Sequence, residues 1–281
     1  MSMILATYLP FFRVHEIELF FLKNISIIKP KFSIIYIDQV FNNKQIELLR
    51  RVLPEGVEVR FGNWRNRNDT WIAMLTEFLQ AGVTPVVVVD SDNVVDEIFL
   101  TLHEKLAHNP IYTVLDEESW QNGARAVLSR SRLIGDINGK PVYAYKVFDG
   151  RFKNILRGGP PFFIGPKQVV VISKLPPPDL LNSLQKALSR VDAQLRNLIS
   201  DETLLGIMAY AMGIREVPWV VASHHHHHGS GSSRGKVSEL LTAIAHYQFA
   251  KSVARELRLR EIRLYRLKYM ISILHNLKSI P

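Results

Sequence analysis

The sequence contains no cysteine among its 281 residues. Without cysteine the chain can form no disulfide, can offer no thiolate nucleophile, and cannot hold zinc or an iron–sulfur cluster through sulfur. No apolar stretch approaches the roughly 20 residues that a transmembrane helix needs, and residues 1–10 lack the charged start and cleavage pattern of a signal peptide. We therefore expect a cytoplasmic protein, either free in solution or peripheral on a membrane.

Several widespread catalytic motifs are also missing. The chain has no phosphate-binding Gly-x-x-x-x-Gly-Lys-Ser/Thr, no Gly-x-Gly-x-x-Gly and no His-Glu-x-x-His. Interpretations as a P-loop nucleoside triphosphatase, a common dinucleotide enzyme or a zincin therefore have no motif to support them.

Positive charge is concentrated near the end of the chain. The 35 lysine and arginine residues exceed the 26 aspartate and glutamate residues by nine. Residues 236–281 hold nine basic and three acidic residues, a net charge of +6, so the preceding 235 residues carry only +3. We therefore expect the last segment to have a distinct role.

This basic segment is predicted to be helical, because residues 237–277 contain no glycine or proline. A helical projection separates an apolar face from a basic face. The apolar face holds Val253, Leu257, Leu264, Leu267, Ile271 and Leu274. The basic face holds Lys251, Arg255, Arg258, Arg263 and Arg266. Such a helix suits an anionic membrane surface, or it packs against the rest of the chain or against a second copy in a homo-oligomer. Nucleic acid is an unlikely partner, because no helix-turn-helix, zinc module or aromatic platform accompanies the charge.

Strand and helix patterns alternate along the first 90 residues. Strands are predicted at 3–9, 32–37, 57–61 and 85–90, and helices at 14–28, 43–53 and 69–80. This alternation predicts βαβ units in a Rossmann-type α/β sheet flanked by helices, whose ligands bind beyond the carboxyl ends of the strands. Asp38 and Asp90 each end a predicted strand, so both should lie at that edge.

The later part of the chain gives a less regular pattern. We predict strands at 168–173 and 217–221 and helices at 179–199 and 201–212. Five histidines followed by a Gly/Ser run form the low-complexity stretch at 224–233. We therefore predict an α/β domain over residues 1–222, a linker over 223–235 and a basic amphipathic helical tail over 236–281.

An acidic pair, Asp90 and Asp92, follows a strand of four consecutive valines. Carboxylates at positions i and i+2 of such a loop can both reach one ion, and oxygen ligands suit Mg²⁺ or Mn²⁺, which keep positions open for substrate phosphates. The alternative is a simple turn with both residues as turn formers. The position of the pair, after three strand–helix steps, favours the metal site.

The order of these features resembles the GT-A family of nucleotide-sugar-dependent glycosyltransferases. The matching features are the opening strand with Thr7, Tyr8, Leu9 and Pro10, the strand-ending Asp38, the stretch 62–68 with its helix, and the pair Asp90 and Asp92. The resemblance implies a GT-A-like mixed sheet and a UDP- or GDP-linked sugar donor. It also implies that the nucleotide base and ribose border Thr7, Tyr8, Leu9 and Asp38, that Arg67 lies near the donor, that Asp92 binds the metal, and that Asp90 contacts the ribose or a metal-bound water.

A second acidic motif, Asp201 and Glu202, opens a predicted helix about 110 residues after the first. It is similar to the motif from which inverting members of the family take their catalytic base. The resemblance thus implies that Glu202 or Asp201 accepts the proton of the acceptor hydroxyl. A carboxylate at a helix start is also a routine cap, so this alternative stays open. The segment 158–165 is similar to the acceptor-side glycine segment of such enzymes.

The histidine run at 224–228 has two interpretations. Five histidines with a Gly/Ser stretch look like a purification tag and linker, and we favour this interpretation. The run also follows a predicted strand where many GT-A enzymes carry a histidine that completes the metal site, and imidazole suits Mn²⁺. Under this second interpretation the candidate ligands are His224 and His226.

The alternative function is a phosphatase or phosphotransferase of the haloacid dehalogenase type. Residues 86–94 also match the nucleophile motif of that family, with Asp90 as nucleophile and Asp92 as general acid. The mechanism of that family also needs a lysine and an acidic pair further along the chain. The nearest candidate is the segment 135–140, which ends at Lys140 and lacks the second acidic residue. We therefore predict a glycosyltransferase that depends on Mn²⁺ or Mg²⁺ and acts on a hydroxyl acceptor that is lipid-linked or close to a membrane.

Overall fold

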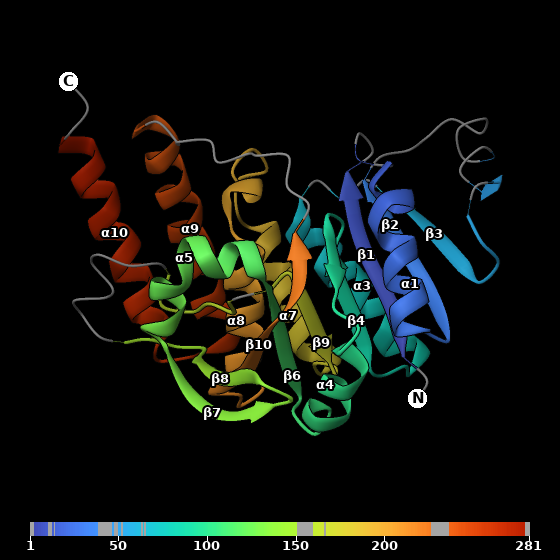
Figure 1. Ribbon diagram of the computed structural model, residues 1–281. Helices are drawn as coiled ribbons and strands as arrows, with labels where there is room; N and C mark the ends of the chain where they lie inside the picture. The colour runs from blue at the N-terminus through green and yellow to red at the C-terminus, as the bar shows by residue number, and fades with distance from the viewer. Residues whose placement is uncertain are drawn as a thin grey trace.

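A computed structural model of the chain describes residues 3–10, 13, 15–38, 47, 50–51, 53–62, 64, 66–150, 160–165, 167–225 and 236–278. A ten-stranded sheet lies at its centre, and helices cover both faces (Figure 1). The strands are β1 (Ile4–Pro10), β2 (Phe32–Asp38), β3 (Val57–Gly62), β4 (Val86–Asp90), β5 (Asn93–Val95), β6 (Ile111–Asp116), β7 (Ser131–Ile137), β8 (Lys140–Lys146), β9 (Val169–Ile172) and β10 (Glu216–His225). The predicted α/β class is confirmed.

The strand order is β3-β2-β1-β4-β9-β6-β10-β8-β7, and β5 pairs with β10. Strands β3, β2, β1 and β4 are parallel, β9 runs antiparallel between β4 and β6, and β10 is parallel to β6. The sheet is therefore mixed, as expected. The carboxyl ends of β1, β4, β6 and β10 consequently lie along one edge, the upper edge in Figure 1.

Helices on the two faces of the sheet bury alternate residues of its strands. The helical elements are η2 (Ile17–Phe21), α1 (Leu22–Ile28), α3 (Arg67–Ala81), α4 (Phe99–Leu106), α5 (Glu117–Leu128), α7 (Pro178–Ser189), η3 (Arg196–Leu198), α8 (Asp201–Ala211), α9 (Lys236–Leu257) and α10 (Ile262–Lys278). In β4, Val86 and Val88 join the core formed with α3, α7 and α8, whereas Val87 and Val89 join the core formed with α1 and α4. A continuous apolar run suits a central strand that is covered on both faces.

Helix α3 carries the first residues of the candidate site, and its start differs slightly from the prediction. The helix begins at Arg67 rather than at residue 69, and Asn66 caps it: the side-chain oxygen of Asn66 accepts the backbone N–H of Asp69 at 2.9 Å, and its amide donates to the Asp69 carboxylate at 2.8 Å. Gly82 ends the helix in a left-handed conformation with φ of 62°. Most of the helix predicted at 43–53 lies outside the described residues.

The predicted helix over 179–199 is wrong in its length, because α7 ends at Ser189. The Asp192 carboxylate accepts the backbone N–H of Gln194 at 2.9 Å, which stabilises a turn. The Arg196 guanidinium donates to the carbonyl of Ser189 at 2.7 Å. Local polar side chains thus satisfy the backbone groups that a longer helix would have paired.

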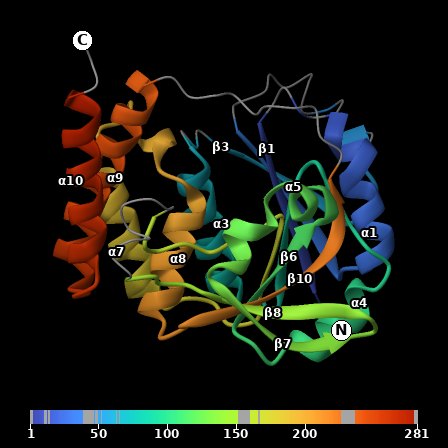
Figure 2. The ribbon, with the colours of Figure 1, turned by 60° about the vertical axis from the view of Figure 1, so that its left-hand side comes forward.

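The basic segment forms two adjacent helices, α9 and α10, instead of one continuous helix (Figures 1 and 2). The chain turns between them at Arg258, whose φ is +50°. Phe249 and Val253 of α9 are fully buried in the same core as Leu184 of α7. Among the described residues, no helix combines the length and apolar character needed to cross a membrane.

Candidate active site

The first carboxylate of the acidic pair, Asp90, lies at the end of β4 between two basic side chains. One oxygen of Asp90 accepts a hydrogen bond from Nη2 of Arg67 at 3.2 Å and lies 3.9 Å from Nζ of Lys167. Arg67 is the first residue of α3, so the capped start of that helix places the guanidinium at the sheet edge. The structure thus brings together Arg67 and Asp90, both of which the resemblance places at the donor.

The second carboxylate, Asp92, faces different partners. Its Oδ2 atom lies 3.2 Å from Nη1 of Arg13 and 3.2 Å from Nε2 of His225. Burial alone would raise the pKa of Asp92, but the charges of His225 and Arg13 outweigh it and lower that pKa. A carboxylate oxygen and an imidazole nitrogen this close form a donor set that suits Mn²⁺, so Asp92 and His225 fit a divalent ion. Within the described residues, no group of three carboxylates or imidazoles gathers as an ion site.

The structure places His225, rather than His224, beside the acidic pair. Strand β10 continues to His225 and pairs it with Asn93 of β5, the residue after Asp92. The neighbouring His224 points elsewhere, with Nε2 2.7 Å from a carboxylate oxygen of Asp96. His226 lies outside the described residues. The alternation of side chains along a strand could have separated the two histidines, had the sequence shown that the strand extends so far.

A buried asparagine fixes the loop that carries the acidic pair. Asn24 of α1 donates to the backbone carbonyl of Asn93 at 2.8 Å and accepts the backbone N–H of Val95 at 2.9 Å. Because Asn24 is almost fully buried, these bonds replace contacts with water. The loop therefore holds Asp92 at a defined place, and its asparagine support was not predicted from the sequence.

Lys167 is the centre of an ionic cluster that the sequence analysis missed. Its side chain is 5% exposed, and its Nζ lies 2.9 Å from Asp201 and 3.8 Å from Glu202. Burial lowers the pKa of Lys167, but the surrounding carboxylates outweigh this effect and raise it. Trp71 of α3 donates from Nε1 to Asp201 at 3.1 Å. Although burial opposes it, Lys167 lowers the pKa of Asp201, so this carboxylate stays ionised.

Glu202, the neighbour of Asp201 on α8, has a different environment. Its side chain is 26% exposed and borders a cavity of about 440 Å³ at the sheet edge. Burial, followed by the negative charge of Asp201, raises the pKa of Glu202 to about 6. A carboxyl group with this pKa, open to a cavity, can exchange a proton near neutral pH. The remaining lining residues include Arg67, Asp90, Lys167 and Gln168, together with Leu115, Ser119, Val127, Phe163 and Gly165.

The wall of this cavity depends on a close approach between Phe163 and α8. A Cβ atom on Gly206 would lie 2.5 Å from the backbone nitrogen of Phe163, so a larger residue does not fit. The backbone N–H of Ile164 donates to the carbonyl of Glu202 at 2.9 Å. The segment 162–165 is therefore fixed directly against the helix that carries Glu202.

The residues expected around the base and ribose are placed unequally. The Thr7 hydroxyl is buried and donates to the carbonyl of Val89 at 2.8 Å, and the Leu9 side chain is buried in the core. Tyr8 is partly exposed and packs on the core that contains α3. Asp38 is the last residue of β2, and its side chain lies outside the described part of the structure.

The lysine required by the phosphatase alternative lies elsewhere. Nζ of Lys140 contacts Asp96 at 3.0 Å and Glu117 at 3.7 Å. Asp136 accepts the backbone N–H of Gly139 at 2.8 Å and thus stabilises the hairpin turn between β7 and β8. The segment 135–140, the nearest candidate for the downstream lysine and acidic pair of the phosphatase, therefore forms a turn with its own local contacts.

No family model matches the sequence, and a search of curated proteins finds no match. Comparison with solved structures does find matches, and these include GT-A glycosyltransferases. S. aureus TarS, residues 1–349, matches with a TM-score of 0.51 and 10% identity over 98% of this chain and 72% of that fragment. The complex of the same fragment with UDP-GlcNAc matches with a TM-score of 0.50 and 10% identity over 98% of this chain and 73% of the fragment. The Pyrobaculum calidifontis mannosyltransferase PcManGT, in complex with GDP-Man and Mn²⁺, matches with a TM-score of 0.48 and 10% identity over 99% of this chain and 74% of the PcManGT chain.

The matches to TarS extend over nearly the whole chain, although few residues are identical. Likeness at this level shows a shared architecture. The chain therefore has the GT-A-like fold that its sequence resembles, with a mixed sheet flanked by helices.

Proposed function

We propose that this chain is a glycosyltransferase that moves a sugar from a nucleotide diphosphate donor, UDP- or GDP-linked, to a hydroxyl group of an acceptor. The observation that carries the proposal is the position of Glu202, which borders a cavity beside Asp90 and has a pKa of about 6. The TarS complex binds UDP-GlcNAc on the same fold, which supports a nucleotide-sugar donor.

Each side chain of the site would have a separate role in this reaction. Glu202 would accept the proton of the acceptor hydroxyl as that oxygen attacks the sugar. Arg67 would donate charge-assisted hydrogen bonds to the anionic donor. Apolar side chains of the cavity, such as Phe163, would pack against the sugar rings and exclude water.

Asp92 and His225 are the residues that would hold a divalent ion, Mn²⁺ or Mg²⁺. When bound, the ion neutralises the charge that develops on the nucleotide diphosphate. Arg13 contacts the same carboxylate at 3.2 Å, so its guanidinium would lie next to an ion held by Asp92. Arg13 would then add positive charge on the leaving-group side.

The test measures nucleotide diphosphate release from UDP-N-acetylglucosamine, UDP-glucose and GDP-mannose with Mn²⁺, and phosphate release from p-nitrophenyl phosphate. We expect release from at least one sugar nucleotide and none from the phosphomonoester. Glu202→Gln should lower the activity by about 100-fold, whereas Glu104→Gln, an exposed control on α4, should leave it unchanged. Phosphate release without nucleotide release would instead support the phosphatase.

We further propose that α10 brings the enzyme to an anionic membrane that carries the acceptor. Met270, Leu274 and Leu277 are 43%, 54% and 53% exposed, and the spacing of three to four residues places them along one side of the helix. Exposed Arg263 and Arg266 precede them at the same spacing, so these two arginines lie on the same side as Leu274 and not on the opposite face as predicted. The end of α10 points toward the same side of the molecule as the carboxyl edge of the sheet (Figures 1 and 2).

Sedimentation with vesicles tests this surface. We expect binding to phosphatidylcholine vesicles that contain phosphatidylglycerol, and loss of that binding in the double variant Leu274→Glu, Leu277→Glu. Leu133→Glu, on the 62% exposed Leu133 of β7, is the control and should bind normally. Unchanged binding in the double variant would refute the proposal, and a dimer in solution that this variant dissociates would assign the surface to a second copy of the chain.

A further inference from the structure

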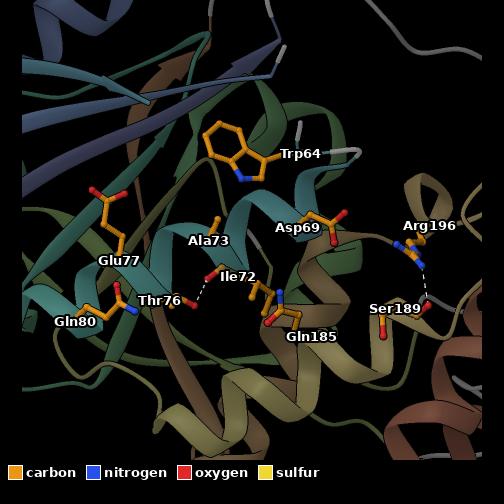
Figure 3. A pocket seen from close by; sticks show the side chains of 10 residues that line it. All are labelled: Trp64, Asp69, Ile72, Ala73, Thr76, Glu77, Gln80, Gln185, Ser189 and Arg196. Atoms are coloured by element: carbon orange, nitrogen blue, oxygen red, sulfur yellow. Dashed lines mark hydrogen bonds between the residues drawn. The ribbon is translucent and has the colours of Figure 1, made fainter. Parts of the chain in front are cut away.

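A second cavity lies between α3 and α7, outside the candidate active site. It encloses about 620 Å³, a size typical of small-ligand sites. Figure 3 shows the side chains that line it: Trp64, Asp69, Ile72, Ala73, Thr76, Glu77, Gln80, Gln185, Ser189 and Arg196. None of these residues has a part in the proposed transfer reaction. We call this cavity the α3/α7 groove.

The α3/α7 groove has an aromatic side and a polar side. The indole of Trp64 lies on one side of α3, and Gln185 and Ser189 of α7 lie on the other (Figure 3). Trp64 is held in place because its ring covers Gly62, where a Cβ atom would lie 2.5 Å from the ring. Its ring centroid also lies 5.5 Å from that of Tyr36. A rigid aromatic surface loses little conformational entropy when it binds a ligand.

The polar groups of the groove suit a ligand with many hydroxyl groups. Among the described residues, the side-chain amides of Gln80 and Gln185 have no hydrogen-bond partner, and each can both donate and accept. Glu77 is already bonded to the Tyr36 hydroxyl at 2.7 Å and to Arg60 at 2.9 Å. These bonds leave the amides as the groups that a ligand would find available.

Charge in the groove argues against a phosphate or nucleotide. Its charged residues are Asp69, Glu77 and Arg196, a net charge of −1. A polyanion would lie close to the carboxylates of Asp69 and Glu77. The guanidinium groups nearby are already engaged, Arg60 with Glu77 at 2.9 Å and Arg196 with the carbonyl of Ser189 at 2.7 Å. An apolar ligand would leave the amides unpaired. A neutral ligand with hydroxyl groups avoids both costs.

We propose that the α3/α7 groove binds a neutral saccharide chain. A sugar ring presents a face of C–H groups, which can pack on the indole of Trp64, and hydroxyl groups, which can pair with Gln80 and Gln185. This binding requires neither donor nor metal. The link to transfer rests on the proposed function: α3 also begins at Arg67 beside Asp90, so a glycan held on this helix stays near the catalytic edge.

Binding to neutral hexasaccharides, without nucleotide or metal, tests the proposal. The probes are maltohexaose, cellohexaose, chitohexaose and mannohexaose, and the readouts are isothermal titration calorimetry and saturation-transfer NMR. We expect saturable binding of at least one probe. Because neither donor nor metal is present, this outcome does not depend on whether the chain transfers sugar. Absence of saturable binding for all four probes would overturn the proposal.

Two variants locate the binding in the groove. Ala73→Leu fills the floor with a good helix former, and Gln185→Ala removes an exposed amide, so each should weaken binding at least about fivefold. The matched controls are Ala81→Leu at the end of α3 and Gln194→Ala in an exposed turn, and both should bind within about twofold of the parent chain. If Ala73→Leu lowers the unfolding temperature, the effect of Gln185→Ala on binding decides whether the groove is the binding site. Equal loss in variants and controls would overturn the assignment.

Discussion

Replacing Lys167 by methionine tests the ionic cluster of the candidate site directly. The change keeps the length and much of the volume of the side chain but removes its charge. Asp201, whose side chain is 6% exposed, would then lose the ammonium group that lies 2.9 Å away. It would retain the indole N–H of Trp71 at 3.1 Å and the more distant charge of Arg67.

The expected cost follows from burial. Removal of one member of a buried ion pair typically costs about 3–5 kcal/mol, because a desolvated charge remains without compensation. The double variant Lys167→Met, Asp201→Asn removes both charges, so it should lose about 2 kcal/mol less than the sum of the two single variants. Lys140→Met is the control: that lysine is 29% exposed beside Asp96, and its loss should cost at most about 1 kcal/mol.

Urea denaturation at pH 7, followed by tryptophan fluorescence, measures these free energies of unfolding. Acid provides a second check. Because the pKa of Asp201 is lowered on folding, its contribution to stability is present above the unfolded value of 3.8 and is lost as the pH falls below it. The difference in the free energy of unfolding between the parent chain and Lys167→Met should therefore become smaller at low pH. A cost of Lys167→Met below about 1 kcal/mol, or additive single variants, would refute the reasoning.

Three further predictions concern the chemistry of the site. The rate of transfer should fall as the pH is lowered through about 6, because Glu202 must be deprotonated to accept a proton, and Glu202→Gln should lose this dependence in a pH–rate profile. Gly206→Ala should displace the segment around Phe163 and raise the acceptor KM more than the donor KM, since the new Cβ would meet that backbone at 2.5 Å; equal changes would contradict the proposed wall. His225→Ala should weaken Mn²⁺ binding, measured by electron paramagnetic resonance, about 10-fold or more, whereas His224→Ala should not; the reverse order would refute the assignment.

The sequence predicts the sheet well because its strongest signals are local. The four valines of β4 belong to a strand that is covered on both faces, and the alternating strands and helices on either side give the parallel half of the sheet. The turn at Arg258 could not be predicted, because the segment has no glycine or proline to mark it. An arginine with φ of +50° is uncommon, and the burial of α9 and α10 against the rest of the chain stabilises the turn.

The same contrast holds for the candidate site. Asp90, Asp92 and Glu202 follow strands or begin helices in recognisable patterns, so the sequence identifies them as candidates. Lys167 carries no such pattern, and the histidine run at 224–228 does not single out His225. Lys167 approaches Asp90 and Asp201 because β9 inserts between β4 and β6, an arrangement that depends on pairing between distant parts of the chain. Sheet order, rather than local sequence, brings these residues to the site.

The start of α8 shows how two adjacent carboxylates can have opposite properties. Asp201 is buried and bonded to Lys167 and Trp71, so it is held ionised and cannot reach a substrate. Its fixed negative charge in turn raises the pKa of Glu202, which borders the cavity. Neutralising Asp201 should therefore weaken the base at Glu202 by lowering its pKa, even though Asp201 itself touches no substrate. In Asp201→Asn the fall in rate with acid should shift to lower pH, an outcome that a purely structural role for Asp201 would not produce.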